Sequence, residues 1–377
     1  MKNFKLVLKS LINNEACVTG GRKLPWYFAV IMLFVSMIIC LVPTFVNTAN
    51  KNGADFVNTY ANGYDVATMR FAEDIQDKGA DMSVHQEQGE KILRFSYAGK
   101  SGAEAWAMAY PEVNSFGHHC YKHLNAENNV DFEIYYIDGT LTQDYLNEIA
   151  QVKNIKEDGS VSIVRRTSNY FIFARNTLMG ALYRANNGSV SGTLYGDYKH
   201  VEEGFGINSL ALVYVDGQML TKETRTNPQF EGAYGAYTRG VWQNWKAFFN
   251  TTYLTNKYTA MWQTTLIMFG INLGIVVFMG LMVYLLTRGK MNPFRIYTIW
   301  DTQKIVYWAA PAPAVLSLVF GFMIASFAQI AFPLLIGMRL MWLSMKTLRP
   351  ENAEVINKPS QPQNKNVQAK TISSKKK

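Results

Sequence analysis

The fold class is decided by WYFAVIMLFVSMIICLVPTFV, residues 26–46, in which 21 consecutive residues carry no charge. About 20 helical residues cross a hydrocarbon layer of about 30 Å. Arg22 and Lys23 precede the stretch, and Trp26 and Tyr27 begin it, where the membrane interface favours aromatic rings. No small-x-small cleavage site of a signal peptide follows. The stretch therefore predicts an uncleaved transmembrane helix 1 with a cytoplasmic N-terminus.

Two further apolar stretches lie in the C-terminal part of the chain. Residues 258–286 predict transmembrane helix 2. Residues 306–346 predict a transmembrane hairpin, helices 3 and 4, with a turn near Ser326–Gln329. A re-entrant hairpin stays open as an alternative, because prolines interrupt this stretch. The predicted fold class is a membrane protein with about four transmembrane helices plus an extracytoplasmic α+β domain.

The charges are unevenly distributed along the chain. Residues 47–257 carry 19 Lys and Arg against 24 Asp and Glu, whereas the remainder carries 18 against 4. Basic residues beside apolar spans mark the cytoplasmic side and attract anionic lipid. We therefore expect residues 1–25, the loop 287–305 and the tail 347–377 in the cytoplasm, and residues 47–257 outside. The lipid bilayer, rather than nucleic acid, accounts for the net charge of +9.

The two ends of the chain differ in character. Residues 1–25 predict an amphipathic cytoplasmic N-terminus, because Phe4, Val7 and Leu11 recur at helical spacing opposite lysines. A frayed tail is the alternative, since short isolated helices are marginally stable in water. The tail 347–377 is rich in Pro, Asn, Gln and Lys and is predicted to be disordered.

The outer domain, residues 47–257, shows mixed helical and strand patterns separated by turn signals such as Asp138-Gly139. Its one cysteine, Cys120, excludes an intramolecular disulfide there. This fits a multi-pass protein of the bacterial cytoplasmic (plasma) membrane. Helices are predicted at 54–62, 66–79 and 142–156, and strands at Ile92–Ala98, Ala105–Tyr110, Val130–Ile137, Ser160–Val164, Tyr170–Ala174 and Leu210–Val215.

The aromatic segment 235–257 leads directly into the second span. Tryptophan and tyrosine rings favour the membrane interface. We expect one helix that runs from the outer domain into the bilayer, with an aromatic belt where it enters.

The densest group of metal-ligand side chains is His118, His119, Cys120 and His123. In a helix, His119 and His123 would share one face. The segment matches no standard ligand spacing, and no second ligand cluster exists. We therefore predict no metal site and keep these four residues as weak candidates, with a polar surface loop as the other interpretation.

No other pattern identifies catalytic or cofactor-binding residues. The sequence contains no nucleophile elbow, phosphate-binding loop, zinc-protease motif or dinucleotide fingerprint. An aromatic strand is surrounded by Arg165, Arg166, Arg175 and Arg184, and arginine there can bind an anionic or sugar ligand or satisfy a charge within the domain. We predict no catalytic residue and no cofactor.

Small residues at four-residue spacing allow close approach of membrane helices. The predicted helix-packing interface comprises Gly270, Asn272, Gly274, Gly321 and Ala325. Both packing within one bundle and packing against a partner protein remain open. Arg339, near the inner end of the last span, is expected to extend to the lipid headgroups.

The order of these parts resembles a known family. FKLVLKSL precedes a first span that ends in LVPTF, and the later spans contain PAPAVLSLVFGF and AFPLLIGMRL. The chain resembles an uncharacterised membrane-protein family of Gram-positive bacteria, some of whose members are described as maltodextrin utilization proteins. The resemblance implies an association with sugar uptake and supplies no catalytic residues.

These features predict a non-enzymatic accessory membrane protein whose extracytoplasmic domain binds a partner or ligand. Its partner is expected to be another membrane protein, such as a transporter permease. A membrane-anchored extracytoplasmic enzyme acting on sugar or cell-wall material is one alternative, and a ligand sensor is another.

Overall fold

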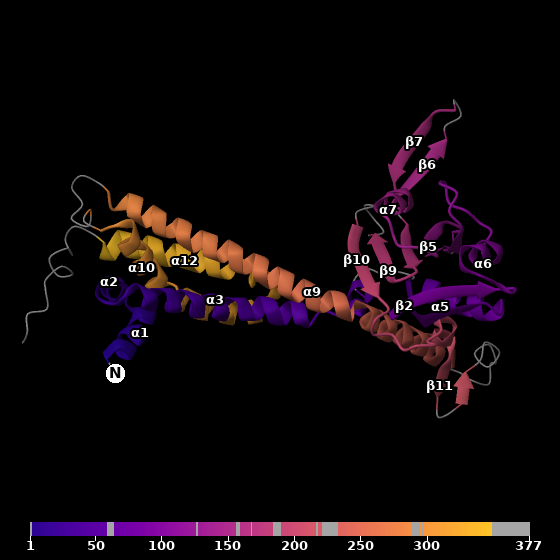
Figure 1. Ribbon diagram of the computed structural model, residues 1–377, viewed down its shortest axis with the longest axis horizontal. Coiled ribbons are helices and arrows are strands. Elements are labelled where there is room, and N and C mark those ends of the chain that lie inside the picture. The colour runs from indigo at the N-terminus through magenta and orange to yellow at the C-terminus, as the bar shows by residue number, and fades with distance from the viewer. Residues whose placement is uncertain are drawn as a thin grey trace, which may run out of the picture. The chain divides into compact units, whose positions relative to one another are not determined.

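The computed structural model describes residues 2–58, 64–125, 127–155, 159–166, 168–183, 190–215, 218–220, 233–288, 295 and 297–348. The chain forms two compact units. The helical unit comprises Met1–Thr48 and Met261–Lys377, and the sheet unit comprises Ala49–Ala260. One helix, α9 (Ala233–Leu286), contributes residues to both units (Figure 1). The predicted disordered tail lies almost entirely outside the described residues.

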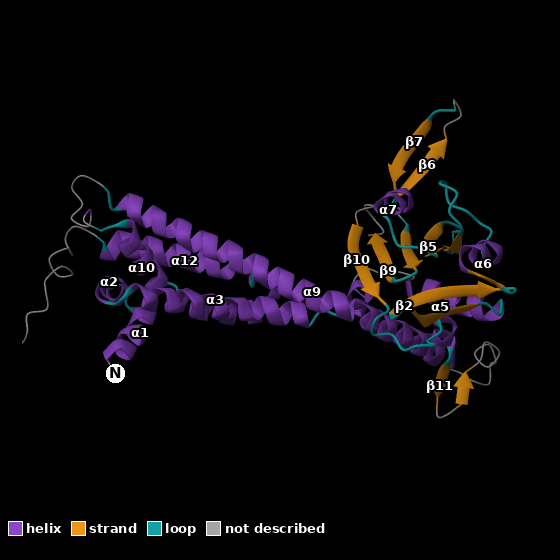
Figure 2. Cartoon of the chain, viewed as in Figure 1, coloured by secondary structure: helices purple, strands orange, loops and turns teal. Residues whose placement is uncertain are grey.

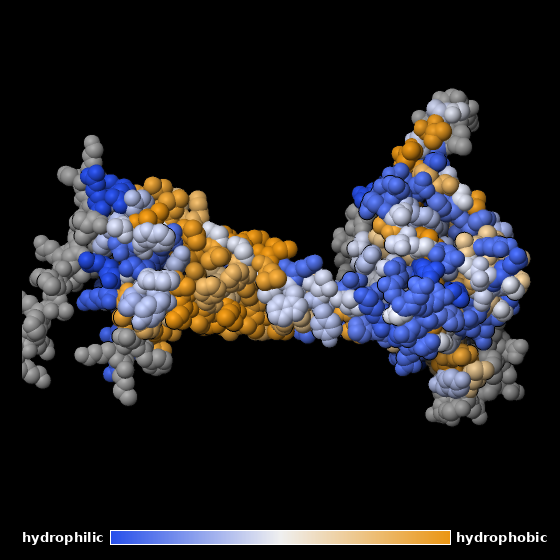
Figure 3. All heavy atoms as spheres, viewed as in Figure 1, coloured by the Kyte–Doolittle hydropathy of each residue, from blue (hydrophilic) through white to orange (hydrophobic). Residues whose placement is uncertain are grey.

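The helical unit holds all or part of the three helices in the described residues that are long and apolar enough to cross a membrane: Trp26–Ala49, Gly235–Leu286 and Ile299–Met323. Apolar side chains cover much of its visible surface (Figure 3). Its elements are α1 (Lys2–Ile12), α2 (Asn14–Lys23), α3 (Trp26–Ala49), the C-terminal part of α9, α10 (Ile299–Ala309), α11 (Pro311–Met323), η3 (Ala325–Phe327), α12 (Ala331–Trp342) and the π-helical turn η4 (Leu343–Thr347).

The apolar stretch 306–346 begins in the last turn of α10 and continues as α11 and α12, which the short turn η3 separates, and it ends in η4. Its prolines begin helices rather than interrupt them: Pro311 occupies the first position of α11, and Pro333 lies in the first turn of α12. Proline is tolerated there because the first-turn N–H groups have no partner within the helix. The third membrane-length segment begins earlier than predicted, at Ile299, because α10 leads directly into α11. Helix α12, where a fourth span was expected, has 12 residues.

The sheet unit is built around a five-stranded sheet of order β10-β9-β8-β5-β4 (Figure 2). The pair β5–β8 is parallel, and the other pairs are antiparallel. Strands β1–β3 form a second sheet, and β6–β7 and β11–β12 are separate hairpins. The strands are β1 (Asp81–Glu87), β2 (Glu90–Tyr97), β3 (Lys100–Ser101), β4 (Cys120–Leu124), β5 (Val130–Ile137), β6 (Gln151–Ile155), β7 (Val161–Arg165), β8 (Asn169–Ala174), β9 (Thr177–Tyr183), β10 (Val190–Asp197), β11 (Val213–Val215) and β12 (Gln218–Leu220).

Successive side chains of a strand point to opposite faces of the sheet, so the five-stranded sheet has two different faces. On β5, Phe132, Ile134 and Tyr136 enter the main apolar core. That core also contains residues of α5 (Tyr64–Asp77), α6 (Gly102–Ala109) and α9. Residue Tyr135 belongs to a smaller cluster on the opposite face, which includes Ile149 of α7 (Gln143–Ile149).

Three local predictions for the sheet unit are wrong in whole or in part. The predicted strand Ala105–Tyr110 is helix α6, which buries Ala105, Trp106 and Ala109 on one face. The predicted helix 142–156 ends at Ile149, and β6 follows after Ala150. The predicted strand Leu210–Val215 contains the 3₁₀ turn η1 (Ile207–Ala211) before β11. The predicted helix at 54–62 corresponds to α4 (Gly53–Asn58), and residues 59–63 lie outside the described part.

Candidate functional site

The structure does not bring the four weak metal-ligand candidates together as one metal site. His123 lies on strand β4, not on a helix, so the condition for a shared helical face with His119 is not met. His118 Nε2 lies 2.6 Å from a carboxylate oxygen of Glu148, and His123 Nδ1 lies 2.8 Å from one of Asp131. Each of these imidazoles therefore has its own carboxylate partner. In the described part of the chain, no three His, Cys, Asp or Glu side chains are grouped so as to hold a metal ion.

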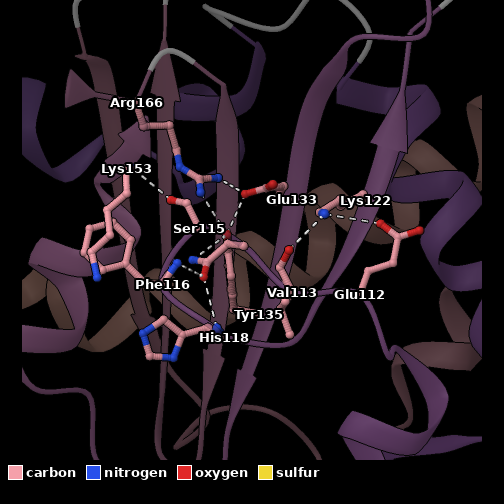
Figure 4. Close-up of polar contacts among 11 residues, drawn as sticks. Glu112, Val113, Ser115, Phe116, His118, Lys122, Glu133, Tyr135, Lys153 and Arg166 are labelled. Atoms are coloured by element: carbon pink, nitrogen blue, oxygen red, sulfur yellow. Dashed lines mark hydrogen bonds and ion pairs between the residues drawn. The ribbon is translucent and has the colours of Figure 1, made fainter. Parts of the chain in front are cut away.

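Arg166, immediately after β7, forms a buried polar cluster with Glu133, Tyr135 and Asn114 (Figure 4). Its guanidinium forms an ion pair with Glu133 and donates to the Tyr135 hydroxyl at 2.9 Å. That hydroxyl donates to Glu133 Oε2 at 2.5 Å and accepts from Asn114 Nδ2 at 3.3 Å. The charge of Arg166 is therefore satisfied within the domain.

The surroundings of this cluster suppress ionisation of its neutral members. Burial raises the pKa of the Tyr135 hydroxyl well above its ordinary value of 10.0. Burial also raises the pKa of the nearby Cys120 thiol. A thiol that stays protonated is a poor nucleophile and a poor metal ligand. These groups therefore stabilise the packing of the domain and lack the ionised nucleophile of a reactive centre.

His118 and His119 line a small pocket of about 230 Å³, together with Asp138 and Tyr145. The His118 ring lies 4.4 Å from the Tyr145 ring, centroid to centroid. Since ligand pockets commonly exceed about 300 Å³, this pocket is small for an organic ligand.

A larger groove of about 510 Å³ lies between α9 and the segment 200–214. We call it the α9 groove. Phe205 and Phe248 form its aromatic floor, with rings stacked at 5.5 Å and an interplanar angle of 5°. Asn244 Nδ2 donates to the carbonyl oxygens of Leu210 and Leu212, both at 3.1 Å, and fixes the opposite wall.

The rim of the α9 groove is polar and accessible. The exposed side chains of His200, Glu202 and Tyr214 border it. Sequence reasoning missed the groove, because it interpreted the aromatic segment 235–257 as a membrane belt. In the structure, Phe248 and its aromatic neighbours pack instead into the core of the sheet unit.

The predicted helix-packing residues have different environments. Asn272 is buried with Nδ2 3.8 Å from Cys40 Sγ, and a Cβ atom on Gly321 would lie 2.7 Å from Pro43 Cβ. A Cβ on Gly270 or Gly274 would meet no described atom within 4 Å, and Ala325 is exposed.

Arg339 has an internal role that the sequence did not reveal. Its guanidinium donates to the carbonyl oxygen of Ala309 at 2.9 Å, to that of Ser10, and to Asn14 Oδ1 at 3.3 Å. The sequence predicted that this side chain extends to the lipid headgroups, and in the structure carbonyl groups at the ends of α1 and α10 bind it. Arg339 therefore links α12 to three other helices.

Comparison with known proteins gives no match to a family model, a curated protein or a solved structure.

Proposed function

We propose that this chain is a non-enzymatic accessory protein of the bacterial cytoplasmic membrane that binds a ligand or partner in the α9 groove. In this proposal the sheet unit lies outside the cell, and both termini lie in the cytoplasm. Its partner in the membrane is another protein, such as a transporter permease. Support comes from the apolar helices, the acidic balance of residues 47–257 and the basic residues beside the spans.

The shape and chemistry of the α9 groove are the observation that carries the proposal. An apolar floor with a few polar groups at the rim is typical of a binding site. Ser209 Oγ donates to the Gly206 carbonyl at 2.6 Å, so this hydroxyl is engaged with the backbone and not with a general base. Among the described lining residues, no nucleophile is hydrogen-bonded to a base, which favours binding over catalysis.

Helix α9 supports a link between ligand binding and the membrane. Asn244 and Phe248 of this helix form part of the groove, while Val276 and Val283 of the same helix enter the core of the helical unit. A ligand that binds the first part of α9 therefore contacts the element that also contributes a candidate membrane span.

The proposal includes a fourth span formed by α12 and η4, Ala331–Thr347. At about 1.5 Å per residue this segment reaches about 25 Å, slightly less than a hydrocarbon layer of about 30 Å. Lys304 before the hairpin and Lys346 after it favour a return to the same side of the membrane. Both two spans and a re-entrant hairpin return the chain to the same side, so it is the length of the segment, and not the position of the lysines, that favours two spans.

The test uses the full-length protein in mild detergent and a variant that fills the groove. Ala247 is exposed on α9 and lines the groove, so Ala247→Trp should block it. Gln243→Trp, at an exposed position one turn earlier, is the matched control. We expect maltodextrin binding, measured by calorimetry, or co-purification of a permease to fall at least about tenfold with Ala247→Trp only.

Two results would count against the proposal. One is recovery of the wild-type protein alone, as a monomer, with no maltodextrin binding. The other is an equal loss of binding in both tryptophan variants. Cleavage of the maltodextrin by the wild-type protein would favour the membrane-anchored enzyme instead.

A further inference from the structure

We infer that two copies of this chain associate through antiparallel pairing of the outer edges of their β7 strands. The hairpin β6–β7 has only two strands and projects from the rest of the sheet unit (Figure 1). Isolated two-stranded hairpins are marginally stable in water. In the described part of the chain, no strand pairs with the outer edge of β7.

The hydrogen bonds of the hairpin show which backbone groups face outward. The Arg166 N–H donates to the Ala150 carbonyl at 3.0 Å, so this pair is hydrogen-bonded across the hairpin. In an antiparallel ladder, hydrogen-bonded and non-hydrogen-bonded pairs alternate. The pair Lys153↔Ile163 is therefore non-hydrogen-bonded, and both residues direct their N–H and C=O groups away from the hairpin. Consistently, the Lys153 N–H donates outward to Ser115 Oγ at 2.9 Å.

The two edges of the hairpin differ in how they are covered. The β6 edge contacts Ser115, and Lys153 Nζ lies 4.0 Å from the centroid of the Phe116 ring (Figure 4). A lysine on an edge strand also opposes strand addition. By the same alternation, β7 directs the backbone groups of Val161, Ile163 and Arg165 outward, and no described group is bonded to them there.

The side chains of β7 are unusually exposed for apolar residues. The exposed fractions of Val161, Ile163 and Val164 are 59%, 57% and 42%. Apolar surface is visible on the hairpin in Figure 3. An exposed edge rich in β-branched residues is a template for another strand.

Two copies of β7 can pair without opposing like charges. Antiparallel pairing centred on Ile163 places Ile163 opposite its own copy, Val161 opposite Arg165, and Ser162 opposite Val164. No like charges oppose one another in this register, whereas a β6–β6 pairing centred on Lys153 would place two lysines together. A second copy of the chain is therefore the occupant that the observations favour.

Pairing of five residues buries far less than the roughly 1,200 Å² of a stable interface in solution. The association should therefore be weak and should depend on confinement of both copies in one membrane, which raises their effective concentration. For this reason the test belongs in native membranes.

Cysteine crosslinking of full-length protein in membranes tests the pairing and its register. The three native cysteines are buried, so the background should be low. Opposed Ile163 residues would have Cα atoms about 5.5 Å apart, within the range of a disulfide. We expect Ile163→Cys to form a dimer with copper phenanthroline. Asn154→Cys on β6 should not, because two β6 strands would lie about 14 Å apart.

A mixed experiment distinguishes the proposed register from random collision. When Ser162→Cys and Val164→Cys chains are expressed together, the heterodimer should exceed either homodimer severalfold. A heterodimer no more than about twice either homodimer, which is the ratio that random collision gives, would overturn the inference, as would no dimer with Ile163→Cys in protein that melts at the wild-type temperature. A crosslink from Ile163→Cys to a chain of different mass would also overturn it and would identify a partner strand instead.

Discussion

At the residue scale, the pair Arg166–Glu133 makes a prediction about stability. Removing one member of a buried ion pair leaves an uncompensated charge and typically costs about 3–5 kcal/mol. We expect that loss for Arg166→Met, measured by urea unfolding of the purified protein followed by near-ultraviolet circular dichroism. The double variant Arg166→Met/Glu133→Gln should be more stable than Arg166→Met alone, because the amide carries no charge and still accepts from Tyr135. A double variant that is less stable than the single one would contradict this account.

The buried tyrosines predict how the stability of the sheet unit depends on pH. Burial raises the pKa of Tyr110, Tyr121 and Tyr198 above the ordinary value of 10.0. Above that pH the unfolded chain loses protons that the folded chain retains, so the free energy of unfolding must fall. We expect the urea midpoint to be constant up to about pH 9 and to decrease above about pH 10. Tyr110→Phe should show a smaller decrease, and an unchanged midpoint at about pH 11 would contradict the prediction.

At the element scale, the close packing of α2 on α10 requires a glycine at position 21. A Cβ on Gly21 would lie 2.9 Å from the backbone nitrogen of Ile305, which cannot move without shifting α10. Gly21→Ala should therefore destabilise the helical unit by about 1–3 kcal/mol, the usual cost of overpacking. Gly274→Ala is the control, because nothing described lies within 4 Å of its added Cβ. Thermal unfolding in detergent, followed by far-ultraviolet circular dichroism, should show a lower midpoint for Gly21→Ala only.

Much of the secondary structure was predictable where apolar residues follow a clear helical or strand pattern. The span at 26–46 became α3, and the predicted strand Val130–Ile137 has the observed bounds of β5. The strand prediction for 105–110 is wrong because alanines at every second position resemble the alternating pattern of a strand. Helix α6 forms there because Trp106 and its neighbours pack against β2 and β5.

The site residues were harder to predict because they depend on contacts between distant segments. Glu133 and Arg166 are separated by 33 positions, and Arg339 meets Ser10 across most of the chain. No local sequence pattern predicts which distant residue a buried arginine will contact. Distance along the chain also hid the α9 groove, since the segment 200–214 forms the wall that faces α9.

At the scale of the whole molecule, the charge distribution predicts which parts of the chain face the outside. Lys199 is exposed in the sheet unit, and Lys23 is exposed at the end of α2. If residues 47–257 are outside, a membrane-impermeant maleimide should label Lys199→Cys in intact cells and Lys23→Cys only after permeabilisation. The wild-type protein is the control, because its three cysteines are buried. Labelling of Lys23→Cys before permeabilisation, with Lys199→Cys protected, would mean that the acidic domain stays inside. The positive charges beside the spans would then need another explanation.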